Sequence, residues 1–321
     1  MANPSPPGII FLVGPTSVGK TALAISLAQW LNTEIISADS RQIYRYLDIG
    51  TGKPSQAQLE LVPHHLISIV YPDEEFTVAD YLKRCLTLVE EFNQKQKIPL
   101  IVGGTGLYIK ALIRGLFGGP GADRRLRYEI KKWVKEKGIS DLYLKLQEVD
   151  PEAAKKIHPH DERRIIRALE VYYQTGTPIS VFQREQTFPP LGSPTLAVGL
   201  KREREDLYRR IEDRIDCMLK EGLIEEVQNL LAQNYTENLN ALNALGYRDI
   251  MHYLKGEQNL DTAINNFKRD TKRLAKRQMT WFRKEERINW YDITGSTNGD
   301  DKAKEVLEQI KSDIQRWLEQ L

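Results

Sequence analysis

The segment at residues 14–21 has the residue types and spacing of a phosphate-binding loop. Its sequence, GPTSVGKT, fits the pattern G-x-x-x-x-G-K-[ST] between an apolar run and a helical segment. Glycines let such a loop curl so that its N–H groups point at phosphate oxygens, at a helix N-terminus whose dipole favours anions. We expect Lys20 to neutralise phosphate charge and the Thr21 hydroxyl to bind Mg²⁺. The predicted binding residues are Gly14, Pro15, Thr16, Ser17, Val18, Gly19, Lys20 and Thr21.

This phosphate loop does not decide the ligand, because backbone amides bind a diphosphate ester and a nucleoside triphosphate alike. A nucleotide hydrolase usually carries an Asp at the end of a later apolar strand, where it holds the water shell of Mg²⁺. The best such strand, residues 98–102, is followed by a glycine loop, Gly103-Gly104-Thr105-Gly106. The ATPase interpretation is thereby weakened but stays open. The glycine loop would admit a planar base close to its backbone, unless it is only a tight turn.

Asp39 is the candidate general base. It follows a short predicted strand at residues 34–37, and a doubly wound sheet presents residues to the ligand crevice at the carboxyl ends of its strands. A carboxylate near the phosphate loop, but outside it, is well placed to take a proton from an acceptor nucleophile. The alternative is that Asp39 or Ser40 only caps a following helix.

The segment at residues 268–287 is strongly basic in a chain that is otherwise close to neutral. It has nine Lys and Arg residues against three acidic ones, a local charge of +6, whereas the 321-residue chain carries +2 in total. Arg269, Lys272, Lys276 and Arg283 recur on one helix face, with Trp281 beside them. This combination suits an RNA phosphate backbone and stacked bases, and the alternative is a solvated helix face.

The elements that must position these residues alternate between strand and helix. Strands are predicted at residues 8–13, 34–37 and 98–102, and helices at residues 21–31, 80–94 and 107–114. This order is typical of an α/β fold, here a P-loop core in which helices flank a parallel sheet. A predicted strand at residues 195–200 would rejoin the sheet, and most of the chain after residue 203 is expected to be helical.

A helical insertion is expected within this core. Four glycines and a proline break the chain between residues 115 and 121, and charged helices follow at residues 124–136 and 140–148. A helix capped by Asp161 carries Arg163, Arg164 and Arg167 on a second basic face, and residues 188–194 are a predicted linker. The predicted domains are therefore a P-loop core, residues 1–120 and 191–321, and an insertion, residues 121–190. A single-stranded RNA loop could be held between the two basic faces.

The cysteine count and the hydropathy indicate the cellular compartment. Cys85 and Cys217 lie far apart without the spacing of a zinc site, so we expect reduced thiols. No signal peptide is recognisable, and no stretch approaches the roughly 20 apolar residues of a membrane span. We therefore expect a cytoplasmic protein with no membrane partner.

Taken together, the motifs resemble those of the tRNA dimethylallyltransferase (tRNA isopentenyltransferase) family. Besides the phosphate loop, the resemblance rests on SADSRQIYRYLDIGTGKP at residues 37–54, PHHL at 63–66, LIVGGTGLYIKAL at 100–112, ALGYRDI at 244–250 and LAKRQMTWFR at 274–283. No Cys/His pairs follow the last motif, so an enzyme of the bacterial type is expected. This chain has Arg41, Tyr46, Gly52 and Ser68 where the family frequently has Met, Gly, Ala and Asp.

The resemblance implies a reaction: transfer of a dimethylallyl group from dimethylallyl diphosphate to N6 of the adenosine at tRNA position 37, beside the anticodon. It implies that the phosphate loop holds the donor's pyrophosphate with Mg²⁺, that Asp39 is the general base, and that Thr105 contacts the reacting groups. Lys20 and Arg214 would bind pyrophosphate. The implied partner is the tRNA anticodon stem-loop, and we expect a monomer. The implied tRNA contacts are Asp39, Ser40, Arg41, Gln42, Thr105, Arg127, Arg163, Arg164, Arg167, Asn243, Gly246, Tyr247, Arg248, Lys276, Arg277, Gln278, Trp281 and Arg283.

Three other functions stay open at this stage. The first is prenyl transfer to free AMP or ATP, against which the basic helix argues, because a mononucleotide needs no such surface. The second is a P-loop small-molecule kinase in which Asp39 activates a hydroxyl group. The third is an RNA-binding protein whose phosphate loop only senses nucleotide.

Overall fold

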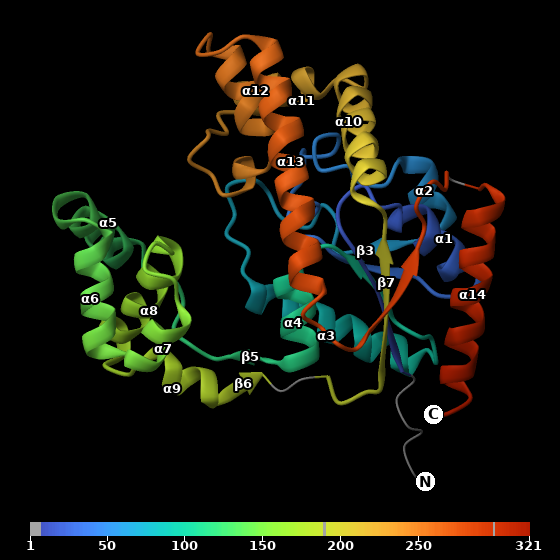
Figure 1. The fold of residues 1–321 in the computed structure, drawn as a ribbon, viewed down its shortest axis with the longest axis horizontal. Helices are drawn as coiled ribbons and strands as arrows, with labels where there is room; N and C mark the ends of the chain where they lie inside the picture. Colours follow the sequence, from blue (N-terminus) through green and yellow to red (C-terminus); the bar gives the residue numbers. More distant parts are fainter. Residues whose placement is uncertain (1–7, 189–190, 298) are drawn as a thin grey trace. The chain divides into compact units, whose positions relative to one another are not determined.

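The computed structural model describes residues 8–188, 191–297 and 299–321. The chain forms two compact units (Figure 1). The first unit comprises the chain up to Ile109 and from Ser193 onward, and the second is Lys110–Gly192. The second unit includes residues 121–190, the range of the predicted insertion, and begins earlier than predicted, at Lys110.

The first unit is built on a parallel sheet, as the strand and helix alternation predicts. Its strand order is β3-β2-β4-β1-β7-β8, and each neighbouring pair is parallel. Because sheets of this kind are covered on both faces, their strands read as continuous apolar runs, and every residue of β1 is fully buried. The strands are β1 (Ile9–Val13), β2 (Ile35–Ala38), β3 (His64–His65), β4 (Leu100–Gly103), β7 (Thr195–Lys201) and β8 (Ile288–Asp292).

The chain re-enters this sheet after the second unit. β7 pairs with β1 in parallel, from Ile9 opposite Thr195 to Val13 opposite Gly199, which confirms the strand predicted at residues 195–200. The sequence did not predict β8, which lies between the helices expected after residue 203 and pairs with β7 in parallel. β8 is an edge strand in which Asn289 and Asp292 are exposed, so it lacks the continuous apolar run that identifies a central strand.

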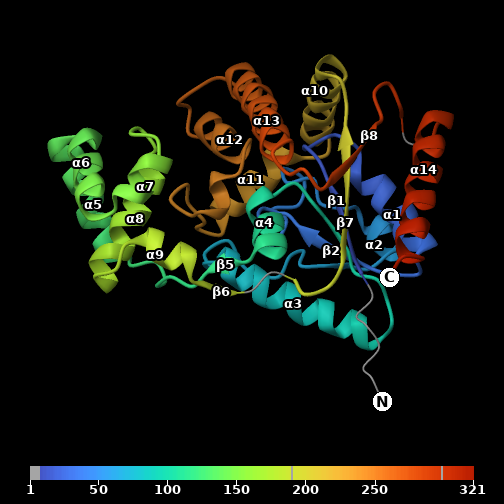
Figure 2. The same cartoon turned by 60° about the horizontal axis from the view of Figure 1, so that its bottom comes forward.

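Helices cover both faces of the sheet. Figures 1 and 2 show α1 and α14 on one side of the strands and α3 and α4 on the other. α3 begins at Val78, close to the start predicted at residue 80, and a capping box between Thr77 and Asp80 stabilises its first turn. The helices assigned to the sheet unit are α1 (Lys20–Trp30), α2 (Gln56–Leu61), α3 (Val78–Gln94), α10 (Arg204–Lys220), α11 (Leu223–Ala232), α12 (Tyr247–Leu254), α13 (Leu260–Phe282) and α14 (Asp301–Leu318), with a short 3₁₀ turn η1 (Ala241–Asn243). α4 (Gly106–Arg114) starts in the sheet unit and ends in the second.

The second unit has its own apolar core. Ile130, Leu142, Leu146, Ile165 and Leu169 are buried together there. Asp161 caps α8 by accepting a hydrogen bond from the Arg164 amide, as the sequence predicts. The elements are β5 (Leu116–Phe117), α5 (Arg124–Lys137), α6 (Ile139–Val149), α7 (Pro151–Lys156), α8 (Glu162–Thr175), α9 (Ile179–Arg184) and β6 (Gln186–Phe188). The linker predicted at residues 188–194 includes residues 189 and 190, which lie outside the described residues.

In the part of the chain that the structure describes, no helix combines the length and apolar character that crossing a membrane requires.

Candidate active site

The phosphate loop connects β1 to α1 and passes close to β7. A Cβ atom at Gly14 would lie 2.7 Å from the carbonyl oxygen of Leu200, so only glycine fits there. Ser17 has a left-handed φ of 62°, and its buried Oγ has no hydrogen-bond partner within the described residues. A buried hydroxyl without a partner is costly unless a ligand satisfies it, and an anion in the loop would do so.

Lys20 lies at the first position of α1 and turns back over the loop. Its Nζ donates hydrogen bonds of 3.0 Å to the Gly14 carbonyl and 2.8 Å to the Pro15 carbonyl. Burial lowers the pKa of Lys20 to about 8, although the nearby Asp39 carboxylate opposes this effect, and Arg214 lowers the pKa further. An anion beside Nζ would favour the charged form, so the site is electrostatically prepared for phosphate.

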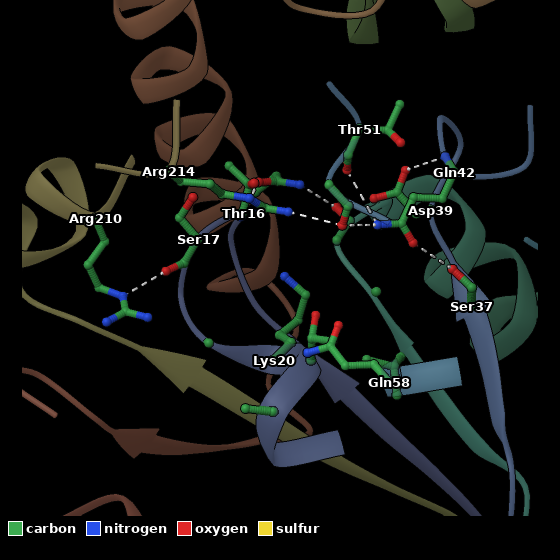
Figure 3. Close-up of a pocket in the computed structure, with 18 of the residues that line it drawn as sticks. Thr16, Ser17, Lys20, Ser37, Asp39, Gln42, Thr51, Gln58, Arg210 and Arg214 are labelled. Carbon is green, nitrogen blue, oxygen red and sulfur yellow. Dashed lines mark hydrogen bonds between the residues drawn. The ribbon is translucent and has the colours of Figure 1, made fainter. Parts of the chain in front are cut away.

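A cavity of about 410 Å³ opens over this loop (Figure 3). It lies at the carboxyl ends of β1, β2 and β4, where a parallel α/β sheet binds its ligands. The predicted residues that line it are Thr16, Ser17, Gly19, Lys20, Thr21, Asp39, Gln42, Gly103, Gly104, Arg214 and Gln278. The lining residues that the sequence analysis did not name as site residues include Ser37, Thr51, Gln58, Arg210, Asp213 and Cys217.

Asp39 follows β2 and closes a turn. Its Oδ1 accepts hydrogen bonds from the backbone amides of Arg41, at 2.8 Å, and Gln42, at 3.3 Å. Residues 40–43 form turns and no helix, so the helix-cap alternative for Asp39 is wrong. These bonds hold the carboxylate at the cavity wall.

Thr105 lies just past β4, next to the Asp39 turn. Its Oγ1 accepts a 3.0 Å hydrogen bond from the Ser40 amide, and its own amide donates to the Ala38 carbonyl at 3.2 Å. The structure therefore brings together Asp39 and Thr105, which are far apart in the sequence.

Two arginines of α10 extend the positive wall of the cavity. Arg214 donates to the Gly52 carbonyl at 3.1 Å, and Arg210 donates to the Ser17 carbonyl at 3.2 Å. Burial lowers the pKa of both guanidinium groups. Arg210 was missed, and its signal was the spacing of four residues from Arg214, which puts both on one helix face.

α13 meets the cavity through Gln278. Its Oε1 accepts a hydrogen bond from the Thr16 amide, and its Nε2 donates to the Gly104 carbonyl, each at 2.9 Å. One side chain thus joins the phosphate loop to the glycine loop.

The basic charge of α13 is divided between two halves of the helix. Lys268 and Lys272 pair with Asp216 and Glu212 of α10, and Arg269 and Arg273 pair with Asp270. The predicted RNA contacts Lys276 and Arg277 in the second half, and Arg283 directly after the helix, are exposed. Trp281 lies against Gly106, where a Cβ atom would meet the indole at 2.5 Å. The exposed charge is therefore concentrated near the glycine loop.

The predicted contacts near η1 differ in exposure. Asn243 and Arg248 are exposed, whereas Gly246 and Tyr247 are buried. The Tyr247 hydroxyl donates to Glu226 at 2.5 Å, and Glu226 also accepts from the amides of Asp48, Ile49 and Gly50. Glu226 thus holds the segment that leads to Gly52, and no sequence motif distinguished it from the other acidic residues of α11.

In the second unit, the predicted arginines fall into two pairs. Arg127 and Arg167 form ion pairs with Glu170, which is fully buried, and the Asp123 amide donates to the same carboxylate. Arg163 and Arg164 are exposed on α8. The first pair therefore organises the unit around Glu170, whereas the second pair lies at the surface, where Arg164 forms a 3.4 Å ion pair with Asp161.

The described residues contain no group of three or more His, Cys, Asp or Glu side chains placed to hold a metal ion. Thr21 and Asp39 do line the same cavity, so oxygen donors that suit Mg²⁺ are present beside the phosphate loop.

The sequence model of the IPP transferase family matches residues 42–285. A tRNA dimethylallyltransferase 2 from Geotalea uraniireducens is 47% identical over 288 residues, 90% of this chain and 93% of that protein. A tRNA dimethylallyltransferase from Acetivibrio thermocellus is 48% identical over 88% of this chain and 90% of that protein.

Solved structures agree in fold. The tRNA isopentenylpyrophosphate transferase of Bacillus halodurans is 38% identical, with a TM-score of 0.71 over 97% of each chain. A eukaryotic dimethylallyltransferase described as acting on tRNA is 30% identical, with a TM-score of 0.81 over 96% of this chain and 79% of that one. The similarity extends over both units.

Proposed function

We propose that this chain, which belongs to the IPP transferase family, is a tRNA dimethylallyltransferase of the bacterial type. It would move the dimethylallyl group of dimethylallyl diphosphate to N6 of adenosine 37, beside the anticodon, and release diphosphate. The observation that carries this proposal is the single cavity in which a phosphate loop, two arginines and Asp39 meet. A diphosphate leaving group and a nucleophile that must lose a proton need these two kinds of group side by side.

The donor would bind with its diphosphate in the phosphate loop. Lys20, Arg210 and Arg214 supply positive charge there, and the Ser17 hydroxyl, which has no hydrogen-bond partner among the described residues, supplies a further donor. Thr21 and the diphosphate oxygens would hold Mg²⁺, which would supply further charge neutralisation. Charge on the leaving diphosphate grows as the reaction proceeds, and each prearranged donor that is lost typically costs about 3 to 4 kcal/mol of transition-state stabilisation.

The acceptor amino group is a weak nucleophile, because its lone pair is delocalised into the adenine ring. In the proposed step, the bond from N6 to C1 of the dimethylallyl group forms while the C1–O bond to diphosphate breaks. The N6 proton passes to Asp39, and the electron pair of the broken bond leaves with diphosphate. Proton removal of this kind contributes about 10²- to 10⁴-fold to the rate. Thr105 would contact the reacting groups from the glycine loop.

The RNA partner would be the anticodon stem-loop of tRNA. The target base has to leave the loop stack to enter a cavity of this kind. Exposed cations of each unit would bind the RNA, namely Lys276, Arg277 and Arg283 in the first and Arg163 and Arg164 in the second. Ser40, Arg41 and Gln42 lie beside Asp39, where the flipped base would be. We also propose that the enzyme is a cytoplasmic monomer.

The decisive experiment is incubation of the purified protein with Mg²⁺, dimethylallyl diphosphate and unmodified tRNA carrying A36-A37-A38. Mass spectrometry of the nucleosides should detect N6-dimethylallyladenosine, and a tRNA with G37 should yield none. Product from AMP but not from tRNA would replace the proposal with the adenylate prenyltransferase. ATP consumption without a prenyl donor would replace it with the kinase. RNA binding without any product would leave only a binding protein.

A further inference from the structure

Gln278 is the one side chain of α13 that lines the cavity among the described residues. Figure 1 shows α13 running past the strands toward α4, so its second half passes the glycine loop. The neighbours Lys276 and Arg277 are exposed, whereas Gln278 is half-buried. The same helix segment therefore presents cations outward and one neutral amide inward.

The oxygen and the nitrogen of the Gln278 side-chain amide each make a hydrogen bond. The Thr16 amide is a donor, so it requires the Gln278 oxygen, and the Gly104 carbonyl is an acceptor, so it requires the Gln278 nitrogen. The two bonds therefore fix the orientation of the amide group. They join two loops that follow β1 and β4, the strands at the centre of the site.

The glycine loop is fitted closely to this side chain. A Cβ atom at Gly104 would lie 2.5 Å from Gln278 Nε2 and 3.3 Å from the Gly14 carbonyl oxygen. Trp281, three residues further along the same face, lies as closely against Gly106. Two glycines of the loop thus accommodate two side chains of α13 that lie one helical turn apart, which fixes the loop against the helix.

We propose that Gln278 is a positioning residue for the diphosphate donor and not a contact to RNA. It holds the phosphate loop and the glycine loop at a set separation, so that the Thr16 region and Thr105 face the donor and the acceptor together. The inference rests on the proposed function and assigns Gln278 a role different from that of the cations beside it.

Gln278→Met tests this role, because methionine keeps the length of the side chain and removes both hydrogen bonds. We expect the Kd for inorganic pyrophosphate with Mg²⁺, titrated without RNA, to rise about tenfold, the loss typical of two ordinary hydrogen bonds. KM for dimethylallyl diphosphate should rise with it, and the Kd for the anticodon stem-loop should stay within about twofold. The matched control is the exposed neighbour Arg277→Met, which should weaken RNA binding and leave pyrophosphate binding unchanged.

The opposite pattern, weaker RNA binding and unchanged pyrophosphate binding in Gln278→Met, would overturn the inference. Unchanged binding of both ligands would overturn it as well. Because pyrophosphate binding is measured without turnover, this result is separate from failure of the prenyl-transfer assay. If Gln278→Met does not fold, Gln278→Glu serves instead, since it keeps the acceptor for Thr16 and should still raise the pyrophosphate Kd.

Combining a larger residue at Gly104 with a smaller one at Gln278 tests whether the effect on pyrophosphate binding comes from the contact between the two residues or from a general loss of stability. Gly104→Ala alone should push the Gln278 amide away and raise the pyrophosphate Kd. In a Gln278→Ser background, the added methyl group has room, so the same change should cost several-fold less. Strictly additive effects of the two substitutions would contradict the inference.

Discussion

The hydroxyl oxygen of Thr105 accepts a 3.0 Å hydrogen bond from the amide of Ser40, which joins the segments that follow β4 and β2. Asp39 directly precedes Ser40, and its carboxylate accepts hydrogen bonds from the amides of Arg41 and Gln42 in the same turn. The position of the proposed base is therefore set by the three backbone amides that follow it, one bonded to the Thr105 hydroxyl and two to its own carboxylate.

Asp39→Asn should abolish most turnover and preserve the site. The Asn side-chain oxygen can still accept from the Arg41 and Gln42 amides, so the turn is kept while the base is lost. We expect a rate of prenyl transfer lower by about 10²- to 10⁴-fold in single-turnover assays.

The control for this substitution is binding. The Kd values for pyrophosphate and for the anticodon stem-loop should stay close to those of the unchanged protein. A single-turnover rate within a few-fold of the unchanged protein would remove Asp39 from the role of base.

The charge of Lys20 should make donor binding sensitive to alkaline pH. The pKa of Lys20 is lowered to about 8, so the ammonium group is mostly charged at pH 7 and loses its proton as the pH rises past 8. Only the charged form attracts diphosphate, so kcat/KM for dimethylallyl diphosphate should fall above pH 8, by up to about tenfold per pH unit.

Lys20→Arg is the matched comparison, because a guanidinium group keeps its charge throughout this range. Its activity should be lower, since the fork of an arginine does not reproduce the bonds to Gly14 and Pro15, but the fall above pH 8 should disappear. An identical fall in both proteins would assign the titration to another group.

Glu170→Gln should destabilise the second unit. Burial alone raises the pKa of Glu170, but hydrogen bonds from Arg127, Arg167 and the Asp123 amide outweigh this and lower it. The carboxylate therefore stabilises the fold above its unfolded pKa, and this contribution is lost as the pH falls through the lower folded pKa. Removing the charge leaves two arginines without their partner, at a cost of about 3 kcal/mol.

Hydrogen exchange of the α8 peptide at neutral pH would measure this cost as exchange faster by about 100-fold. Glu136→Gln on α5 is the control, because its pair with Lys132 is exposed and 3.7 Å long. Equal exchange in the two variants would mean that the Glu170 cluster contributes little to stability.

The sequence was sufficient for the parts of the fold that repeat a simple pattern. The apolar runs of β1, β4 and β7 and the spaced apolar residues of α3 and α13 predict their type correctly, because burial on a sheet or a helix face imposes that periodicity. The phosphate loop and Asp39 could be found because each needs particular residue types at a strand end. The family resemblance, and not periodicity, supplied Thr105 and Arg214.

The remainder of the site depends on contacts between segments far apart in the chain. The Gln278 side chain accepts a hydrogen bond from Thr16, and Glu226 accepts hydrogen bonds from residues 48–50. These bonds form only because the fold brings α13 and α11 close to the loops that follow the strands. A glutamine or glutamate on an amphipathic helix carries no local signal for such a contact. For the same reason, the sequence did not show that Arg127 and Arg167 surround a buried carboxylate.

Tyr46 is in a conformation that favours glycine. Its φ is 66°, in the left-handed region, where a Cβ atom costs roughly 1 kcal/mol or more. The residue is 42% exposed, and its ring centroid lies 5.8 Å from that of Tyr71 and 6.3 Å from that of Tyr235. These contacts offset the strain. Tyr46→Ala removes the ring but keeps the strain, whereas Tyr46→Gly removes both.

The glycine variant should therefore be more stable than the alanine variant by about 1 kcal/mol in urea unfolding, although glycine is ordinarily the less stabilising residue. This reversal of the usual order is the diagnostic result. An alanine variant as stable as the glycine variant would show that the backbone at this position relaxes once the ring is gone, and that the three tyrosines, not the turn, impose its conformation.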